Sequence, residues 1–527
     1  MKAAWVGVAV LLTTGPGAQA QSRAAELDRA FERFWKAGSR QAALKTVPAL
    51  LQTGADFAEI YARLRADRPL AERPRTGELS LTAMLADGRG RPYSVVVPDD
   101  LAPNEELPVR FQLHGGVNRP APQEGEAPRP GRRRNLEAGR EILVFPSADR
   151  EALWWSEAQV ENLAAILDRL KRAYRIDNNR VYLTGISDGA TGVYYIAQRD
   201  TTPWASFLPL NGQPLVLTNP DVGVEGDFYV RNLANKPWFL VNGGRDPLYP
   251  VAGVVPVVEL LRRASVPLEF HPQPDAGHDV SWWPRVHDDF AAFVRKHPRA
   301  PLPDHIAWES DRPERFGRAH WLVIEALGAA AGEAVFDDFD TVASRGPRDF
   351  GLRVEPQRPG APRVLDVIRG SDAQALGLER GDVVLELHGR PVASADELWQ
   401  ALQGYELGTP LRAAVERKGR RVALEAVLQP AAGPERVFKR TRASGRVELQ
   451  RSGNQVELRT RGVRRLKLLL SPDQFDFDQP LRVVANGRPV FEGRLQRSAS
   501  TLLTWAARDN DRTMLFGAEL KLDLPAR

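Results

Sequence analysis

The feature that most constrains this chain is a short apolar run ending in a serine flanked by glycines. Residues 181–186 read Val-Tyr-Leu-Thr-Gly-Ile, and Ser187, Asp188 and Gly189 complete the pattern G-x-S-x-G. In this pattern the glycines let the backbone turn sharply from a strand into a helix, which lifts the serine hydroxyl into solvent. A serine becomes a nucleophile only beside a base and an oxyanion-binding site. The pentapeptide alone is a weak signal, so its partners must be found elsewhere in the chain.

Strand and helix patterns alternate around this turn. Apolar strands are expected at 108–113, 142–145, 181–183 and 238–241, with a hairpin before them and an amphipathic helix at 160–174. This alternation predicts an α/β fold in which helices cover a mostly parallel sheet. Active sites on such sheets lie at the carboxyl ends of the strands.

Two further residues follow the serine in the chain order of a hydrolase triad. Asp246 comes directly after the predicted strand at 238–241, and His278 lies in the loop Asp275-Ala276-Gly277-His278-Asp279. We expect His278 to take the Ser187 proton and Asp246 to fix the imidazole tautomer. The alternative for Asp246 is a helix cap or an Asx-turn.

Other carboxylates and imidazoles compete for these roles. Asp275 and Asp279 are rival partners of His278, although their closeness to it in sequence makes them less natural orienting groups. His271, His287 and His297 lack the loop glycine that precedes His278, and we expect them at the surface.

The tripeptide His114-Gly115-Gly116 ends the first parallel strand. The backbone N–H groups of Gly115 and Gly116 are predicted to form an oxyanion hole together with the N–H of Asp188. We expect His114 to orient this loop rather than to transfer protons.

Four stretches together resemble the α/β-hydrolase superfamily, in particular secreted polyhydroxybutyrate-depolymerase-like and feruloyl-esterase-like enzymes. They are YRIDNNRVYLTGISDGA at 174–190, HGG at 114–116, GGRDPLYP at 243–250 and AGHD at 276–279. The resemblance covers about residues 76–300 and implies a serine esterase that needs no metal or cofactor. Ala190 departs from the family, which often has a glycine there.

Two aromatic pairs and one basic run lie in predicted loops near these motifs. Trp154-Trp155 and Trp282-Trp283 are predicted to form an aromatic substrate wall, with packing beneath the loops as the alternative. The three arginines at 132–134 are expected to form a solvated loop rather than an anion site.

Residues 350–428 resemble the PDZ domain of bacterial envelope proteases. The resemblance rests on the turn Gly-Leu-Glu-Arg-Gly-Asp at 377–382 and on a helix that opens with Ser394 and Glu397. It implies capture of an extended C-terminal peptide as an added strand. The predicted carboxylate loop is Phe350, Gly351 and Leu352, with Trp399 and Leu402 on the groove helix; a structural spacer is the alternative.

The predicted organisation has five parts. They are a signal peptide at 1–20, a helical segment at 21–75, the α/β-hydrolase catalytic domain at 76–300, a β-rich accessory domain at 301–343 and 431–527, and the PDZ domain at 344–430. The two β-rich pieces are expected to form one domain, because the first is too short to bury its strands alone.

The N-terminus predicts export. Lys2 precedes an apolar run at 3–12, and Ala18-Gln19-Ala20 fits a cleavage site after Ala20, so we expect a periplasmic or secreted protein. The run is too short for a stable membrane span. The absence of cysteine from the sequence excludes disulfides, thiolate metal sites and cysteine nucleophiles. A net charge of +5 over 527 residues gives no reason to expect a nucleic-acid partner.

The leading hypothesis is an exported carboxylic-ester hydrolase that forms an acyl-enzyme on Ser187. Its PDZ module would contact a peptide or a neighbouring domain. One alternative is a serine peptidase of the prolyl-oligopeptidase type, although no long propeller precedes the sheet. The other is a non-catalytic envelope scaffold, against which the ordered triad argues.

Overall fold

A computed structural model of the chain describes residues 16–66, 68, 74–85, 87–102, 105–122, 126–128, 139–218, 227–249, 251–329, 334–342, 350–355, 360–403, 405, 408–428 and 434–524. The basic run at 132–134 and most of the predicted signal peptide lie outside these residues. Helix α1 (Pro16–Lys36) crosses the predicted cleavage site after Ala20. Within the described residues, no helix combines the length and the apolarity that crossing a membrane requires.

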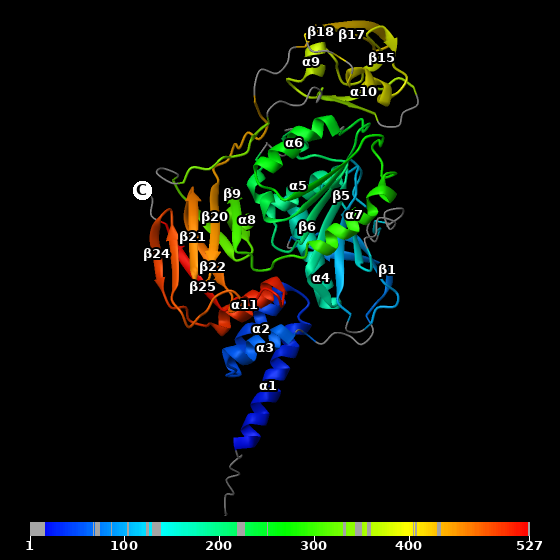
Figure 1. Cartoon of the computed structure of the whole chain (residues 1–527). Helices are drawn as coiled ribbons and strands as arrows, with labels where there is room; N and C mark the ends of the chain where they lie inside the picture. The colour runs from blue at the N-terminus through cyan, green and yellow to red at the C-terminus, as the bar shows by residue number, and fades with distance from the viewer. Residues whose placement is uncertain are drawn as a thin grey trace, which may run out of the picture.

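An eight-stranded sheet organises the middle of the chain (Figure 1). Its strands are β1 (Gly77–Met84), β2 (Gly90–Val97), β3 (Leu107–Leu113), β4 (Ile142–Pro146), β5 (Ile176–Ile186), β6 (Ser206–Leu210), β7 (Trp238–Gly243) and β8 (Leu268–Gln273). They lie side by side in the order β1-β2-β4-β3-β5-β6-β7-β8. β2 pairs antiparallel with β1 and β4, and the other neighbours pair parallel. This mostly parallel sheet confirms the α/β fold predicted from the sequence.

Helices pack on both faces of this sheet. They are α4 (Glu157–Ala173), α5 (Asp188–Arg199), α6 (Val251–Arg263) and α7 (Trp283–Lys296), with the short turns η2 (Pro214–Thr218) and η4 (Val230–Asn235) after β6. Trp238 and Leu240 of β7 join the core formed with α5 and α6, whereas Phe239 and Val241 join the core formed with α7. This alternation follows from the two-residue period of a strand. β7 is therefore buried on both faces, as a central parallel strand must be.

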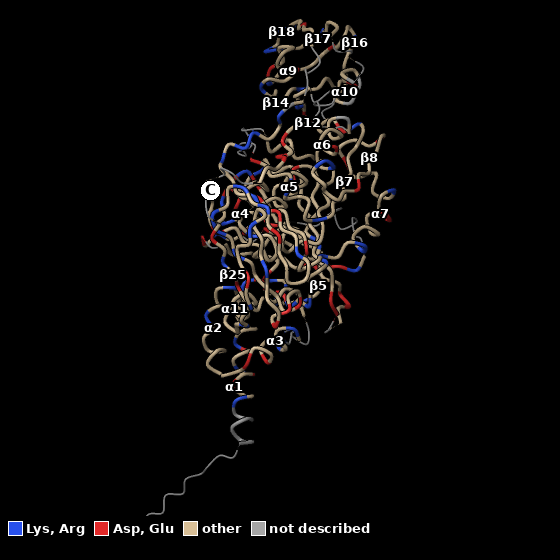
Figure 2. The backbone as a smooth tube through the Cα atoms, turned by 60° about the vertical axis from the view of Figure 1, so that its left-hand side comes forward, with Lys and Arg blue, Asp and Glu red and all other residues tan. Residues whose placement is uncertain are grey.

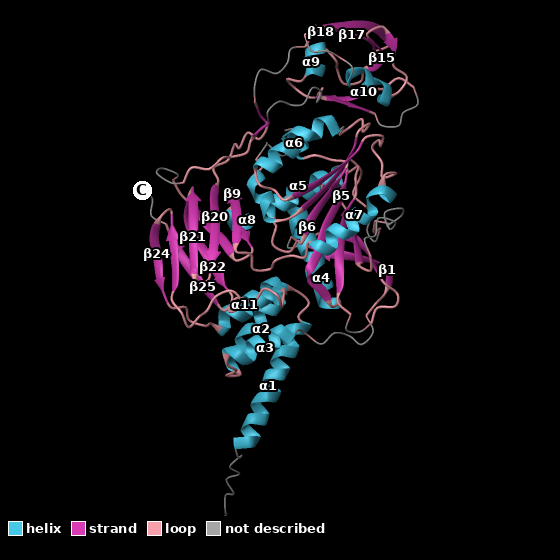
Figure 3. Cartoon of the chain, viewed as in Figure 1, coloured by secondary structure: helices cyan, strands magenta, loops and turns pink. Residues whose placement is uncertain are grey.

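The β-rich pieces on either side of the inserted unit share their sheets (Figure 3). Their elements are β9 (His305–Ser310), α8 (Pro313–Phe316), β10 (Arg318–Ala319), β11 (Leu322–Leu327), β20 (Gly445–Ser452), β21 (Gln455–Arg461), β22 (Val463–Leu470), β23 (Leu481–Ala485), β24 (Arg488–Gly493), α11 (Ala499–Asp509) and β25 (Ala518–Asp523). β9 pairs with β20, and β11 pairs with β22. One core, which includes Trp308, Trp321 and Leu466, lies between the two sheets. These contacts support the proposal of one β-rich domain interrupted by an insertion.

The inserted unit has its own core, to which Leu352, Leu376 and Leu411 contribute. Its elements are β13 (Leu352–Val354), β14 (Val364–Val367), α9 (Asp372–Leu376), β15 (Val383–Leu387), β16 (Arg390–Pro391), α10 (Ala395–Gln403), β17 (Pro410–Arg417) and β18 (Arg420–Val427). The chain enters and leaves it through β12 (Thr341–Val342) and β19 (Glu435–Arg436), which pair antiparallel. The unit therefore stands on a two-stranded stalk, and the stalk contacts α6 through a hydrogen bond from Arg263 to the Thr341 carbonyl.

The N-terminal helices pack on the C-terminal part of the chain. α2 (Arg40–Gln52) and α3 (Phe57–Ala66) lie with α1 against α11, where Phe31, Leu50 and Ile60 share a core with Leu502 and Leu503. Sequence patterns did not predict this pairing, because it joins segments at opposite ends of the chain.

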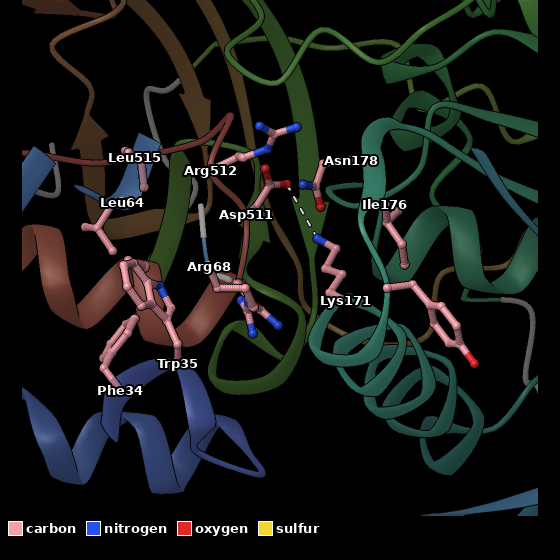
Figure 4. A pocket seen from close by; sticks show the side chains of 13 residues that line it. Phe34, Trp35, Leu64, Arg68, Lys171, Ile176, Asn178, Asp511, Arg512 and Leu515 are labelled. Atoms are coloured by element: carbon pink, nitrogen blue, oxygen red, sulfur yellow. Dashed lines mark hydrogen bonds and ion pairs between the residues drawn. The ribbon is translucent and has the colours of Figure 1, made fainter. Parts of the chain in front are cut away.

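Charged side chains contribute to the pocket between these helices and the eight-stranded sheet. Figure 4 shows Lys171 of α4 facing Asp511, which follows α11, with 3.6 Å between their Nζ and Oδ2 atoms. Arg299 donates to the same carboxylate at 2.6 Å. Burial opposes ionisation of Asp511, but the charges of Arg299 and Lys171 outweigh it and hold the pKa of this carboxyl below its usual range. Elsewhere, cationic and anionic residues are interspersed along the backbone (Figure 2).

Candidate active site

The backbone at Ser187 makes the strained strand-to-helix turn that the motif predicts. Ser187 lies between β5 and α5 with φ 57° and ψ −121°, a conformation that few residues other than glycine adopt. A Cβ atom on Gly185 would lie 2.1 Å from the Gly189 carbonyl oxygen. A Cβ atom on Gly189 would lie 2.3 Å from the carbonyl oxygen of Leu113 on β3. Close backbone approach therefore requires glycine at both positions.

Gly212 makes room for the side chain of Ala190, the residue at which the sequence departs from the family pattern. Ala190 is fully buried, and a Cβ atom on Gly212 would lie 2.6 Å from the Ala190 methyl carbon. Gly212 follows β6, the strand next to β5 in the sheet. The methyl group of Ala190 thus occupies space that the missing side chain of Gly212 leaves.

The structure brings the three predicted triad side chains together at the carboxyl edge of the sheet. His278 Nε2 lies 2.9 Å from Ser187 Oγ, and His278 Nδ1 lies 2.7 Å from Asp246 Oδ2. Asp246 is completely buried, and its Oδ1 accepts hydrogen bonds from the backbone N–H groups of Leu248 (2.8 Å) and Tyr249 (2.9 Å). These two bonds hold the carboxylate in one orientation.

The direction of each hydrogen bond between Asp246, His278 and Ser187 follows from which group can donate a proton. An ionised carboxylate can only accept, so His278 Nδ1 carries the proton that it shares with Asp246. Nε2 of the neutral ring then has a free lone pair for the Ser187 hydroxyl. The arrangement has the geometry that general-base activation of a serine requires.

The rival residues have other partners. Asp275 pairs with Arg245 at 3.2 Å on the surface, and an oxygen of Asp279 accepts the N–H of Ser281 at 2.7 Å. His271 lies 3.7 Å from Glu269, and His287 hydrogen-bonds to the neighbouring Asp288 at 2.9 Å. The remaining candidate, His297, lies 4.0 Å from Glu269.

The predicted oxyanion loop lies against Ser187. A Cβ atom on Gly115 would be 2.9 Å from the Ser187 Cβ. Asp188 begins α5, where a backbone N–H has no acceptor within the helix. The side chain of Asp188 has a second role that sequence reasoning missed, because its Oδ2 accepts the N–H of Val117 at 2.9 Å. This bond ties the loop to the start of α5.

His114 is buried beneath this loop, and its ring bonds to backbone groups. Nε2 accepts the N–H of Ala148 at 3.1 Å, and Nδ1 lies 2.9 Å from the Gly115 carbonyl oxygen and also contacts Nη2 of Arg119. Its own carbonyl accepts the indole N–H of Trp154 at 2.8 Å. In this position His114 orients the loop.

The prediction of an aromatic substrate wall is wrong for Trp154 and Trp282, which have no exposed surface. Trp154 packs on the His114 ring and beneath the loop, and Trp282 packs in the core with α7. Trp155 and Trp283 are only 7% and 8% exposed. Exposure depends on how distant segments pack over a side chain, and loop position in the sequence does not reveal it.

Tyr249, which sequence reasoning also missed, packs beside the imidazole of His278. Its ring centre lies 5.7 Å from that of His278. Burial, followed by the negative charge of Asp188, raises the pKa of Tyr249, whereas the guanidinium of Arg353 acts against the shift. Tyr249 is therefore a neutral wall of the site.

The predicted carboxylate loop of the inserted unit begins β13. Phe350 and Leu352 are 3% and 6% exposed and belong to the core of the unit, as do Trp399 and Leu402 of α10. Gly351 has φ 69°, and a Cβ atom there would lie 2.1 Å from the Ser371 Cβ. Glycine is thus required at this position. Peptide binding by this loop stays a prediction.

Within the described part of the chain, no cluster of three or more His, Asp or Glu side chains is placed to hold a metal ion.

Comparison with known proteins assigns one segment directly. Residues 348–428 match the family model of the PDZ domain. This segment is a PDZ domain. A 130-residue stretch of the chain is 29% identical to a bifunctional acetylxylan esterase/xylanase of Neocallimastix patriciarum. That stretch is 24% of this chain, and the match spans only 18% of the length of the relative.

Solved structures also show likenesses, at lower identity. A ferulic acid esterase is 17% identical, with a TM-score of 0.33, over 42% of this chain and 98% of that one. The S-formylglutathione hydrolase of Staphylococcus aureus is 15% identical, with a TM-score of 0.34, over 43% and 98%. The dipeptidyl peptidase 4 of Porphyromonas gingivalis is 14% identical, with a TM-score of 0.34, over 42% and 36%. At these values the likenesses identify neither substrate nor reaction.

Proposed function

We propose that the protein is a serine hydrolase that cleaves carboxylic esters through an acyl-enzyme on Ser187. The observation that carries the proposal is the continuous hydrogen-bonded chain from buried Asp246 through His278 to Ser187, with 2.7 and 2.9 Å between successive atoms. A nucleophile, a base and an orienting carboxylate in this geometry form an acyl-transfer site.

The reaction follows from the positions of these groups. Ser187 Oγ attacks the ester carbonyl while its proton moves to His278 Nε2. The backbone N–H groups of the oxyanion loop and of Asp188 stabilise the resulting oxyanion. His278 then gives the proton to the departing alkoxide as the C–O bond breaks, which leaves the acyl group on Ser187. A water molecule activated by His278 repeats the sequence and frees the acid.

The acetylxylan esterase portion of the curated relative's name supports an ester rather than a peptide as the bond that is cleaved. We also propose export, from the N-terminal pattern at 1–20, to the periplasm or the medium. The β-rich domain, with the N-terminal helices on α11, would serve as an accessory module. The PDZ domain would capture a peptide C-terminus at residues 350–352.

Turnover of matched substrates tests the proposal. Purified protein is assayed with p-nitrophenyl acetate, a methyl ferulate ester and a peptide p-nitroanilide, beside Ser187→Ala and His278→Ala. The proposal expects ester hydrolysis that both variants abolish and little anilide cleavage. Anilide cleavage that outpaces ester cleavage and depends on Ser187 would replace the esterase with a peptidase. Ester turnover that survives in Ser187→Ala would refute the site.

A further inference from the structure

Arg119 folds back over the oxyanion loop and holds two consecutive carbonyl groups. Its Nε donates to the Gly116 carbonyl at 3.0 Å, and its Nη2 donates to the Gly115 carbonyl at 2.7 Å. Nη2 also contacts the ring of His114. The backbone of Arg119 is itself held, because its N–H donates to the Val117 carbonyl at 2.8 Å and its carbonyl accepts the N–H of Arg150 at 3.0 Å.

Because the peptide unit is planar, the two hydrogen bonds from Arg119 also fix the direction of two backbone N–H groups on the other side of the loop. In a trans peptide unit the C=O and the N–H point in opposite directions. The Gly115 carbonyl shares its unit with the Gly116 N–H, and the Gly116 carbonyl shares its unit with the Val117 N–H. One guanidinium bonds both carbonyls, so both N–H groups point away from Arg119.

The second of these N–H groups shows where they point. Val117 N–H donates to the Asp188 carboxylate at the start of α5, 2.9 Å away. Within the described residues the Gly116 N–H has no acceptor. It is therefore an unused donor on the face of the loop that meets the nucleophile turn.

We infer that Arg119 is the positioning residue of the oxyanion hole: its fork fixes both peptide units so that the Gly116 N–H faces the oxyanion formed on attack by Ser187. This inference rests on the proposed function. The loop needs such a clamp because two consecutive glycines leave it conformationally free, and Gly116 adopts φ 64°. Arginine suits the role because its rigid fork donates from two nitrogens at once, which a lysine ammonium cannot reproduce.

Arg119→Met and Arg119→Lys test the inference, with uncharged p-nitrophenyl acetate as substrate and phenylboronic acid as the probe. The boronate forms a tetrahedral adduct on serine and so reports on the oxyanion hole without turnover. Removing one oxyanion donor lowers kcat by about a hundredfold or more, so we expect a misaimed donor in Arg119→Met to lower kcat about 10- to 100-fold. KM should stay within about twofold, because only the transition state uses the donor. The inhibition constant of the boronate should rise by the same factor as kcat falls.

Arg119→Lys should lose less kcat than Arg119→Met, since lysine keeps one charged donor. If Arg119→Met is less stable than wild type, Arg119→Lys serves as the test variant. The matched control is Arg140→Met, which removes a surface arginine paired with Asp100 and Glu105 and should leave kcat unchanged. Unchanged kcat in Arg119→Met, a rise in KM alone, or a fall in kcat without weaker boronate binding would each overturn the inference. A wild-type protein that neither hydrolyses the ester nor binds the boronate would instead overturn the proposed function, and the inference with it.

Discussion

The substitution Asp246→Asn separates the orienting role of Asp246 from its bulk. Oδ1 of Asp246 accepts two backbone N–H groups, at 2.8 and 2.9 Å, and Oδ2 faces His278 Nδ1 at 2.7 Å. An asparagine must keep its oxygen on the two N–H donors, since the reverse orientation would place amide hydrogens against them. Its NH₂ group then faces Nδ1 and forces the imidazole to carry its proton on Nε2. That tautomer cannot accept the Ser187 proton.

The expected loss of kcat is large because His278 no longer adopts the tautomer that can accept the Ser187 proton. The equivalent exchange in the serine-protease triad lowers kcat by about 10⁴-fold, or about 5 kcal/mol of barrier, and we expect a similar loss here. Since the variant keeps both backbone hydrogen bonds, unfolding free energy should fall by only about 1–2 kcal/mol.

The assay is ester hydrolysis at pH 7 together with urea unfolding of the same samples. Asp275→Asn is the matched control, because Asp275 is exposed and pairs with the surface residue Arg245 at 3.2 Å; its kcat should equal that of wild type. A folded Asp246→Asn protein that retains more than about a tenth of wild-type kcat would refute the tautomer argument.

Three further predictions concern packing, pH and the insertion. Gly212→Ala should destabilise the protein and lower kcat, because its Cβ would lie 2.6 Å from the Ala190 methyl carbon. Adding Ala190→Gly should restore much of the stability and of kcat. Thermal unfolding measures the stability, and ester hydrolysis measures kcat. Burial keeps the pKa of His320 well below its usual value, so the folded protein holds a neutral ring while the unfolded chain takes up a proton below about pH 6.5. The free energy of unfolding should therefore fall as the pH drops below about 6.5, by at most about 1.4 kcal/mol per pH unit. Urea unfolding from pH 7.5 to 5 should show a shallower fall for His320→Asn than for wild type. Asparagine is chosen because it tolerates the positive φ of this position. Joining Thr341 to Arg436 with a short Gly-Ser linker in place of the PDZ domain should leave hydrolysis of p-nitrophenyl acetate within about twofold, because these residues already pair across β12 and β19.

Each of these predictions has its own contradicting result. Gly253→Ala is the control for the packing prediction, since a Cβ atom there meets nothing within 4 Å; equal loss in both glycine variants would remove the steric explanation. Parallel pH profiles for wild type and His320→Asn would show that His320 contributes nothing to acid sensitivity. Loss of folding on removal of the PDZ domain would show that the catalytic and β-rich parts depend on it.

Local sequence patterns predict the features of the site that depend on residues close together in the chain. The serine turn, its flanking glycines and the strand ends that precede Gly115 and Asp246 all depend on a few neighbouring residues. The parallel sheet brings these strand ends to one edge, and the structure places Ser187, His278 and Asp246 within hydrogen-bonding distance there.

What sequence reasoning missed depends on contacts between distant segments. Trp154 looked like a substrate contact but lies buried, with its indole N–H on the His114 carbonyl. The hydrogen bonds from Arg119 to the carbonyls of Gly115 and Gly116 could not be predicted, because bonds from a side chain to backbone carbonyls produce no recognisable sequence motif. Phe31 and Leu503 come from opposite ends of the chain and share one core, which only the folded chain reveals.

The most direct test of the central claim is stoichiometric labelling with a fluorophosphonate, followed by mass spectrometry of the intact protein and its peptides. Wild-type protein should gain one phosphonyl group per chain, located on Ser187, and Ser187→Ala should gain none. Absence of labelling in folded wild-type protein, or equal labelling of Ser187→Ala, would contradict the claim that Ser187 is an activated nucleophile.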